Sequence, residues 1–386
     1  MRLLIAGGGT GGHIYPALAV ARSLRARPTP PELVWLGGRR GLEAGLVKGA
    51  GIRVRRLVLR SLRTVDISVH TVADPLRLAA SVPQAAAILA RERPAAIFTT
   101  GGYVAVPTLL AAEPLRIPVV LWDGNVVPGR AVRYTARLSD AIAVAHEATG
   151  RALAGSGAPW FLTGTPIRDV TEVSRADARR RLDLPDDARV MLIFGGSQAV
   201  ARFNAAVSDA LPRLVERCFV MHVAGDEGYS GALAAREQLP TEGRTRYRPY
   251  PFLRDEMLPA LVAADLVVGR AGSSTLAEVT ALGIPSVIVP YPHAAGHQTL
   301  NARVLADAGA ARLIADEDFD ADALVAAADL LAPDGDAARA AMADAARSLG
   351  RPGAADAVAT LVLAAAERRP LPPADEIERI SRGAAA

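Results

Sequence analysis

The chain contains one cysteine, one lysine and few aromatic residues, and these scarcities exclude several classes of protein. Cys218 is alone, so no disulfide can form within the chain, and its apolar neighbours predict a buried thiol rather than a nucleophile. Aromatic residues make up 4% of the chain, too few to suggest stacking platforms for single-stranded nucleic acid. No apolar run reaches the roughly 18 residues of a membrane-spanning helix. We therefore expect no nucleic-acid partner and no membrane span.

The positive charge comes almost wholly from arginine, since Lys48 is the one lysine, and the formal net charge is +4. Such a balance suits anionic partners, either phosphates or a membrane surface, without choosing between them. A length of 386 residues with 51% apolar residues predicts two domains, each with its own core. The apolar run at the N-terminus is too short for a signal peptide, so we expect a cytoplasmic protein, at most peripheral to a membrane.

The N-terminal segment combines four apolar residues, Leu3 to Ala6, with a glycine-rich stretch at 7–12 and then His13. Apolar residues then recur at helical spacing through Leu24, so the pattern predicts a strand, a tight glycine loop and a helix. Glycines let a phosphate approach backbone amides, and a helix N-terminus adds partial positive charge. The segment indicates either a phosphate site with an imidazole at its mouth or a plain glycine-rich turn with a surface histidine.

Strands and helices alternate through both halves of the chain. We expect strands at 32–37, 53–59, 95–100, 118–122, 141–145, 189–194, 219–224, 266–268 and 286–289. This alternation predicts parallel α/β layers, and the segment at 189–198 repeats the strand and glycine pattern of the N-terminus. We therefore predict two Rossmann-like domains facing across a cleft, the GT-B arrangement, with ligands beyond the carboxyl ends of the strands. A phosphotransferase or a two-domain epimerase could share that architecture.

The domain boundary is expected at a hinge near 164–168. The N-terminal domain would span 1–163, and the C-terminal domain would span 164–352. An alanine-rich helix at 353–368 could pack back on the N-terminal domain. The remaining tail, 369–386, carries little information.

The segment at 264–285 is the most informative part of the second half. Gly272 turns the chain after a strand, and one of the hydroxyl residues at 273–275 is expected to cap a helix that stops at Gly283. Thr275-x-x-Glu278 has the spacing of a capping box, which would give Glu278 a structural role. Alternatively, the Glu278 carboxylate accepts hydrogen bonds from the ribose hydroxyls of a nucleotide. The residues alone leave both interpretations open.

Further polar side chains follow expected loops. His293 and His297 lack an acidic third ligand, so helix capping or sugar binding is favoured over a metal site. Gln298 can donate and accept at once, which suits vicinal sugar hydroxyls. Arg168 is either a solvated hinge residue or a ligand of a diphosphate, and Ser197 could offer its hydroxyl and backbone amides to a phosphate or uridine. We expect no metal and no cofactor.

Taken together and in this order, the motifs resemble those of the MurG family, the N-acetylglucosaminyltransferases of bacterial cell-wall synthesis. The resemblance covers the chain from Leu3 to about Leu361. The matching segments are Gly7–Val20, Thr100–Pro107, Asn125–Gly129, Gly164–Arg168, Phe194–Gln198, Gly272–Gly283 and His293–Asn301.

The resemblance implies an inverting, metal-independent GT-B enzyme. It would transfer N-acetylglucosamine (GlcNAc) from UDP-GlcNAc to the 4-hydroxyl of lipid I, the undecaprenyl-pyrophosphoryl-MurNAc-pentapeptide, and so form lipid II. His13 would be the general base or a key hydrogen-bonding group, and an unperturbed pKa near 6.5 suits a base.

The resemblance also assigns binding residues. In the donor site, Arg168 and Ser197 would lie near the phosphates, Phe252 near uracil, Glu278 on the ribose and Gln298 on the GlcNAc hydroxyls. The donor sugar would further be lined by Thr10, Gly11, Gly12 and Asn125. The acceptor pyrophosphate would be bound by Gly9, Gly101, Gly102 and Tyr103.

Some positions depart from the family pattern. The family usually reads His-Glu-Gln where this chain has Trp122-Asp123-Gly124, an asparagine where Thr165 stands and a glycine at Ala199. These changes bear mainly on the acceptor. The alternatives are therefore a GT-B transferase with another lipid or small-molecule acceptor, and a non-catalytic scaffold that binds nucleotide sugars.

A lipid acceptor anchored in the inner leaflet implies peripheral attachment to the cytoplasmic face of the cell membrane. The segment at 57–93 could contact anionic lipid through Arg60, Arg63 and Arg77. Alternatively, the apolar residues of this segment pack on the sheet; they are Leu78, Val82, Ala86 and Leu89.

Overall fold

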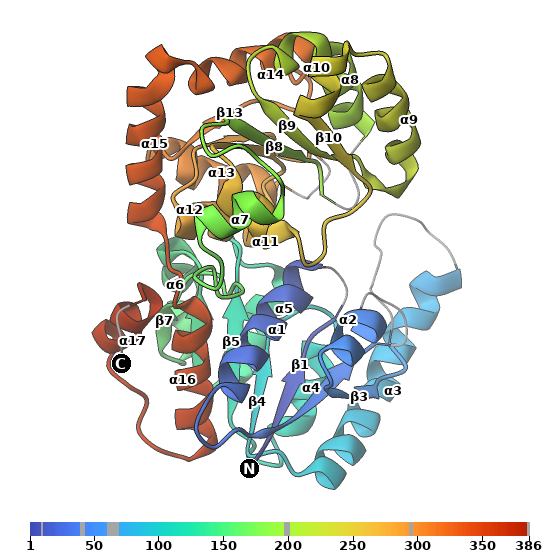
Figure 1. The fold of residues 1–386 in the computed structure, drawn as a ribbon. Coiled ribbons are helices and arrows are strands. Elements are labelled where there is room, and N and C mark those ends of the chain that lie inside the picture. Colours follow the sequence, from blue (N-terminus) through green and yellow to red (C-terminus); the bar gives the residue numbers. More distant parts are fainter. Residues whose placement is uncertain (9–10, 39–42, 60–68, 197–200, 293–295, 384–386) are drawn as a thin grey trace. The chain divides into compact units, whose positions relative to one another are not determined.

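The chain forms two compact units in the computed structural model, which describes residues 1–8, 11–38, 43–59, 69–196, 201–292 and 296–383 (Figure 1). Unit 1 consists of Met1–Asp169 and Arg351–Ala386, and unit 2 consists of Val170–Gly350. Each unit contains one parallel sheet, of seven strands in unit 1 and of six in unit 2. Two Rossmann-like parallel-sheet domains confirm the predicted fold class.

The sheet of unit 1 has the order β3-β2-β1-β4-β5-β6-β7, and the strand order reverses between β1 and β4. Its strands are β1 (Arg2–Ala6), β2 (Glu32–Gly37), β3 (Arg53–Arg56), β4 (Ala96–Thr99), β5 (Val119–Asp123), β6 (Ala141–Val144) and β7 (Trp160–Leu162). Its helices are α1 (Gly11–Arg25), α2 (Glu43–Gly49), α3 (Val69–Glu92), α4 (Ala105–Ala112), α5 (Arg130–Thr135), α6 (Glu147–Leu153), α16 (Ala354–Ala366) and α17 (Ala374–Ser381). Short 3₁₀ turns lie at 136–138 and 154–156.

Successive side chains of β1 point to opposite faces of this sheet and enter two cores. Leu3 and Ile5 pack with residues of α1 and α16, whereas Leu4 and Ala6 pack with residues of α3 and α4. The Ser23 hydroxyl of α1 donates a hydrogen bond of 2.5 Å to Asp356 of α16. The alanine-rich helix near the C-terminus is therefore part of the first core.

The boundary between the units falls after Asp169, so the expected boundary at 163 is wrong. The chain stays with unit 1 beyond β7, because the Trp122 indole donates to the Gly164 carbonyl at 3.0 Å and the Arg351 side chain packs against Gly164. The view of 369–386 as uninformative is also wrong. This segment contains α17, which buries Ile377 and Ile380 in the core of unit 1.

The sheet of unit 2 has the order β10-β9-β8-β11-β12-β13. Its strands are β8 (Val190–Phe194), β9 (Phe219–Val223), β10 (Tyr247–Tyr250), β11 (Leu266–Gly269), β12 (Ser286–Ile288) and β13 (Ala311–Leu313). Its helices are α7 (Arg175–Arg181), α8 (Ala201–Val215), α9 (Gly225–Glu237), α10 (Thr241–Arg246), α11 (Met257–Ala263), α12 (Ser273–Leu282), α13 (His297–Asp307), α14 (Ala321–Ala328) and α15 (Asp336–Leu349). Short 3₁₀ turns lie at 329–331 and 333–335.

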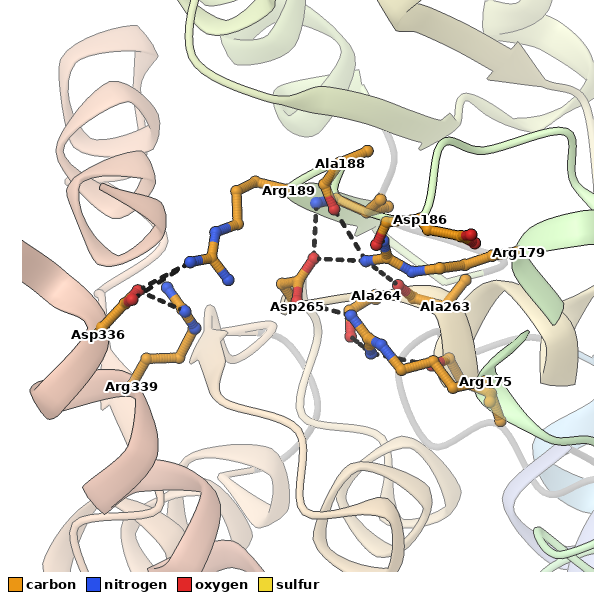
Figure 2. Close-up of polar contacts among 12 residues, drawn as sticks. Arg175, Arg179, Asp186, Ala188, Arg189, Ala263, Ala264, Asp265, Asp336 and Arg339 are labelled. Atoms are coloured by element: carbon orange, nitrogen blue, oxygen red, sulfur yellow. Dashed lines mark hydrogen bonds and ion pairs between the residues drawn. The ribbon is translucent and has the colours of Figure 1, made fainter. Parts of the chain in front are cut away.

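A charged cluster joins α7 to the amino ends of β8 and β11 (Figure 2). Asp265 accepts hydrogen bonds from Val190 N at 2.9 Å, Arg175 Nη2 at 2.6 Å and Arg179 Nη2 at 3.0 Å. Arg179 is 4% exposed and also donates to the carbonyl oxygens of Pro185, Asp186 and Ala188. The cluster gives both Nη atoms of a buried guanidinium hydrogen-bond partners, and it holds α7 on the sheet at the end opposite the carboxyl ends of the strands.

The apolar stripe of α3 packs on the sheet of unit 1, which confirms one of the two alternatives for this segment. Leu89 is buried in the core formed with β1 and α4, and the other three residues of the stripe pack against that core; they are Leu78, Val82 and Ala86. Arg60 and Arg63 lie outside the described residues. Within the described part of the chain, no helix is long and apolar enough to cross a membrane.

Candidate active site

Three loops of unit 1 leave the carboxyl ends of β1, β4 and β5, next to the point where the strand order reverses. His13 lies in the first turn of α1, directly after the first loop, the second loop carries Gly101–Gly102, and the third follows Asp123 and carries Gly124 and Asn125. In open parallel sheets this point is where ligands bind. The predicted strand, loop and helix at the N-terminus are confirmed, since β1 ends at Ala6 and α1 begins at Gly11.

His13 is held in one orientation by the residue that follows β4. Its Nδ1 lies 2.7 Å from the Thr100 carbonyl oxygen, and its own carbonyl accepts from Thr100 Oγ1 at 3.1 Å. A carbonyl oxygen only accepts, so Nδ1 carries the proton and Nε2 of the neutral ring carries the lone pair. Burial lowers the pKa of His13 below its usual 6.5. The neutral imidazole is therefore the prevailing form at pH 7, with a basic Nε2.

The glycine pair after β4 lies beside this nitrogen. Gly101 and Gly102 have φ of 80° and 75°, which non-glycine residues adopt only at a cost. A Cβ on Gly102 would lie 3.8 Å from His13 Nε2 and 3.5 Å from the Gly8 carbonyl oxygen. The Gly101 amide donates to Thr99 Oγ1 at 3.1 Å. The backbone of this loop thus comes close to the imidazole.

The remaining predicted residues of these loops fall into two groups. Gly11 and Gly12 form the first turn of α1, and Tyr103 follows the glycine pair with its ring against Gly38. Gly9 and Thr10 lie outside the described residues, so their assigned roles stay predictions.

Asp123 is a site residue to which the sequence argument gave no role. Its side chain is 3% exposed, and its Oδ1 accepts from the Asn125 backbone and side-chain nitrogens, both at 3.3 Å. Its Oδ2 has no hydrogen-bond partner within the described part of the chain. Burial raises the pKa of Asp123 to about 6. Its position directly at the end of a buried strand was the available signal.

The departures at 122 and 124 depend on each other. The Trp122 ring lies so close to Gly124 that a Cβ there would clash with the indole. A tryptophan at 122 therefore requires glycine at 124, and the Trp122 ring itself is buried in the core of unit 1. Asn125, which the resemblance assigns to the donor sugar, keeps its side chain oriented by Asp123.

We expect Asp123→Asn to remove a pH-dependent cost of burying a charge. The pKa of Asp123 is raised from its ordinary value of 3.8 to about 6 in the folded chain. The protonated carboxyl therefore contributes stability below about pH 4, and this contribution is lost as the pH rises through 6. Burial lowers the pKa of His146, beside Gly124, to about 4, so this histidine is neutral at pH 6 and pH 8. The variant should gain up to about 3 kcal/mol relative to wild type between pH 4 and pH 8.

Urea unfolding of wild type and Asp123→Asn at pH 4, 6 and 8 measures this difference. The exposed Asp375→Asn is the matched control within unit 1, and its difference from wild type should be small at each pH. A gain for Asp123→Asn that is the same at all three pH values would contradict a buried, uncompensated carboxylate.

In unit 2, the loop after β11 leads directly into α12. Gly272 is the N-cap, with φ of −67° and ψ of 138°, and no side chain caps the helix. The predicted hydroxyl cap at 273–275 is therefore wrong, because the helix already begins at Ser273 and Thr275 lies within its first turn. The interpretation of Glu278 as part of a capping box is therefore wrong as well. Glu278 lies in the second turn and is 7% exposed, and the helix ends at left-handed Gly283 as predicted.

Gln298 stands in the first turn of α13, whose N-cap is Gly296 with φ of 75°. Its Oε1 accepts from the Tyr291 backbone nitrogen at 2.9 Å. This bond fixes the orientation of the amide, so that donation by Nε2 is the role it can offer a ligand. His293, at the start of the same loop, lies outside the described residues.

The other residues predicted to bind the donor lie in different segments of the chain. Phe252 follows β10 with 51% of its surface exposed, and the Arg254 guanidinium lies 5.7 Å from its ring centroid. Arg168 is half-buried and belongs to unit 1, not to the second domain as expected. Ser197 lies outside the described residues, directly after the glycine pair that follows β8.

Comparison with known proteins supports the resemblance to glycosyltransferases that the motifs indicated. The profile of the glycosyltransferase family 28 N-terminal domain matches residues 3–144, and that of the C-terminal domain matches residues 190–358. The crystal structure of Acinetobacter baumannii MurG matches with a TM-score of 0.73 and 28% identity, over 94% of this chain and 99% of that one. Two Rossmann-like units with these matches define a family 28 glycosyltransferase.

Among sequences, the chain is 38% identical over 372 residues to a UDP-N-acetylglucosamine–N-acetylmuramyl-(pentapeptide) pyrophosphoryl-undecaprenol N-acetylglucosamine transferase of Desulforudis audaxviator, covering 94% of this chain and 98% of the relative. A transferase of the same description from Leuconostoc citreum is 34% identical over 368 residues, with 95% and 98% covered. The chain belongs to the MurG family of these transferases, which confirms the resemblance drawn from its motifs.

Proposed function

We propose that this chain transfers GlcNAc from UDP-GlcNAc to the 4-hydroxyl of lipid I and so forms lipid II for peptidoglycan synthesis. The observation that carries the proposal is the placement of His13 in a chain so closely matched to these transferases. Its basic Nε2 faces the Gly101–Gly102 loop, and its Nδ1 is fixed on the Thr100 carbonyl. A general base must be oriented and deprotonated at neutral pH, and both conditions hold for this imidazole.

The reaction is a single displacement. The acceptor 4-hydroxyl oxygen forms a bond to the anomeric carbon, and the bond from that carbon to the β-phosphate oxygen breaks with its electron pair leaving on UDP. The hydroxyl proton passes to His13 Nε2. Attack from the face opposite the leaving group inverts the α-linked donor to a β-linked product. The glycine backbone at 101–102 and at 9, with Tyr103, binds the acceptor pyrophosphate.

The donor is bound through groups at the carboxyl ends of the unit 2 strands. The exposed Phe252 ring stacks on uracil, Glu278 accepts from the ribose hydroxyls, and Gln298 donates to a GlcNAc hydroxyl. Arg168 and Ser197 bind the diphosphate and stabilise the charge of leaving UDP, so that no metal is needed. Thr10, Gly11, Gly12 and Asn125 line the donor sugar.

We propose peripheral attachment at the cytoplasmic face of the cell membrane, because lipid I is anchored there. Support comes from the basic charge of the chain, carried almost wholly by arginine. The apolar stripe of α3 is used in the core, so any lipid contact of this region falls to its arginines.

A second candidate is transfer to a different lipid or small-molecule acceptor. The change at Gly124 favours it, because glycine leaves the loop that carries Asn125 without the polar side chain that the family pattern has there. This alternative shares the donor and the fold with the first proposal.

The test is an assay of the purified chain with radiolabelled UDP-GlcNAc and a short-chain lipid I analogue. We expect a labelled, β-linked disaccharide product, formed equally well in the presence of EDTA. Binding of UDP-GlcNAc without transfer to lipid I would favour another acceptor, which a panel of lipids and small molecules can identify. Donor binding with no transfer to any acceptor would instead indicate a nucleotide-sugar-binding scaffold.

A further inference from the structure

Arg270 is a buried cation at the carboxyl end of β11 for which the proposed reaction has no direct use. Its side chain is 6% exposed. It stands between Gly269, the last residue of β11, and the loop that leads to the N-cap of α12. A guanidinium at such a depth needs several partners to offset its lost hydration.

Those partners come from three other parts of unit 2. Nη1 lies 3.2 Å from the Val289 carbonyl oxygen and 3.3 Å from that of Pro290, both in the loop after β12. It also lies 2.5 Å from Asp316 Oδ1. The guanidinium carbon is 4.8 Å from the ring centroid of Phe203 in α8 and 5.4 Å from that of Tyr291. Arg270 thus binds the segment 289–291 through two carbonyls and one aromatic face.

The same segment orients Gln298. The Tyr291 backbone nitrogen, one residue beyond the carbonyls that Arg270 holds, donates to Gln298 Oε1 at 2.9 Å. A continuous set of contacts therefore runs from the Arg270 guanidinium through 289–291 to the amide of Gln298. If the segment shifts, this hydrogen bond lengthens and the direction of the Gln298 Nε2 donor changes.

We propose that Arg270 is a positioning residue for recognition of the sugar of the nucleotide-sugar donor. It holds 289–291 in the conformation that presents Gln298 to a sugar hydroxyl, and it does not itself contact the sugar. This inference rests on the proposed donor, UDP-GlcNAc. It predicts that loss of the guanidinium fork weakens binding of the sugar while binding of the nucleotide is largely kept.

The test uses the full chain and measures dissociation constants for UDP-GlcNAc and for UDP by calorimetry. Arg270→Lys keeps a charge but loses the planar guanidinium that lies over the Phe203 and Tyr291 rings. We expect its Kd for UDP-GlcNAc to rise about tenfold and its Kd for UDP to change less than about threefold. Arg202→Lys is the matched control, since Arg202 also pairs with Asp316 but is 46% exposed, and it should bind both ligands as wild type does.

A double-mutant cycle with Gln298→Ala separates positioning from a general loss of structure. If Arg270 acts through Gln298, the double variant binds UDP-GlcNAc no more weakly than Gln298→Ala alone. Equal losses for UDP and UDP-GlcNAc, or effects that multiply in the double variant, would overturn the proposal. Should Arg270→Lys not fold, Tyr291→Leu removes the aromatic contact and keeps the backbone nitrogen, and the same cycle applies.

These dissociation constants can be measured whether or not the chain transfers GlcNAc to lipid I. A wild-type chain that binds UDP-GlcNAc but does not glycosylate lipid I would contradict the proposed acceptor and leave the Arg270 test in force. A wild-type chain that does not prefer UDP-GlcNAc over UDP in any measurable way would overturn the role of Arg270.

Discussion

Replacing His13 by alanine is expected to lower kcat for transfer to a lipid I analogue by about a hundredfold or more. The substitution removes the Nε2 that takes the hydroxyl proton, while the donor residues of unit 2 are untouched. KM for UDP-GlcNAc should therefore change little. Steady-state kinetics with purified protein, followed by the labelled disaccharide product, measures both constants.

The conservative variant His13→Asn separates a base from a hydrogen-bonding group. An asparagine amide can still donate to the Thr100 carbonyl that now fixes Nδ1, but it cannot accept a proton at neutral pH. We expect it to be nearly as inactive as the alanine variant. Near wild-type activity of His13→Asn would keep the proposed function and refute the assignment of a base.

The pH profile of the wild-type enzyme gives an independent check on this assignment. Burial lowers the pKa of His13, so the neutral base persists below pH 6.5 and the acidic limb of kcat should lie below that value. An acidic limb at or above pH 6.5 would mean that another group controls the rate.

The second large effect is expected on stability. Asp265→Ala should lower the free energy of unfolding of unit 2 by about 3–5 kcal/mol, because it leaves the buried guanidinium of Arg179 without its carboxylate. The amide of Val190 loses its acceptor in the same step. Arg179 keeps its hydrogen bonds to carbonyl oxygens, which do not neutralise its charge (Figure 2).

Arg175→Ala is the control for this prediction, since Arg175 pairs with the same carboxylate but is 47% exposed. An exposed ion pair contributes little, so we expect a loss of at most about 1 kcal/mol. Urea unfolding of both variants, monitored by circular dichroism, gives the comparison. Similar losses in the two variants would show that burial of Arg179 does not determine the strength of the cluster.

The interior strands of both sheets were predicted from their sequence, whereas three of the four edge strands were not. Interior strands such as β5 and β8 are buried along their whole length, so they appear as continuous apolar runs bounded by glycine or proline. The missed strands β7, β10 and β13 are three or four residues long and partly exposed. A strand of three or four partly exposed residues gives too short a sequence pattern to be recognised and is defined by its neighbour's hydrogen bonds.

Some residues of the candidate site were likewise predicted from the sequence, and others were not. His13 and the glycine pair at 101–102 were recognised because each follows a strand within a few residues, so local spacing places them at one edge of the sheet. Asp123 and Arg270 were not recognised as site residues. The partners of Arg270 include Asp316 and Tyr291, which come from other loops, and the raised pKa of Asp123 comes from its burial in the folded unit.

The sequence by itself determined the two α/β halves, the family and the chemical nature of the loops, because each of these follows from short-range patterns of apolar residues, glycines and polar groups. Only the tertiary structure decided that the last helices complete the first core and that Gly272 rather than a hydroxyl residue begins α12. It also decided which nitrogen of His13 is basic. Burial and hydrogen-bond partners set these properties, and both arise when segments far apart in the chain come together.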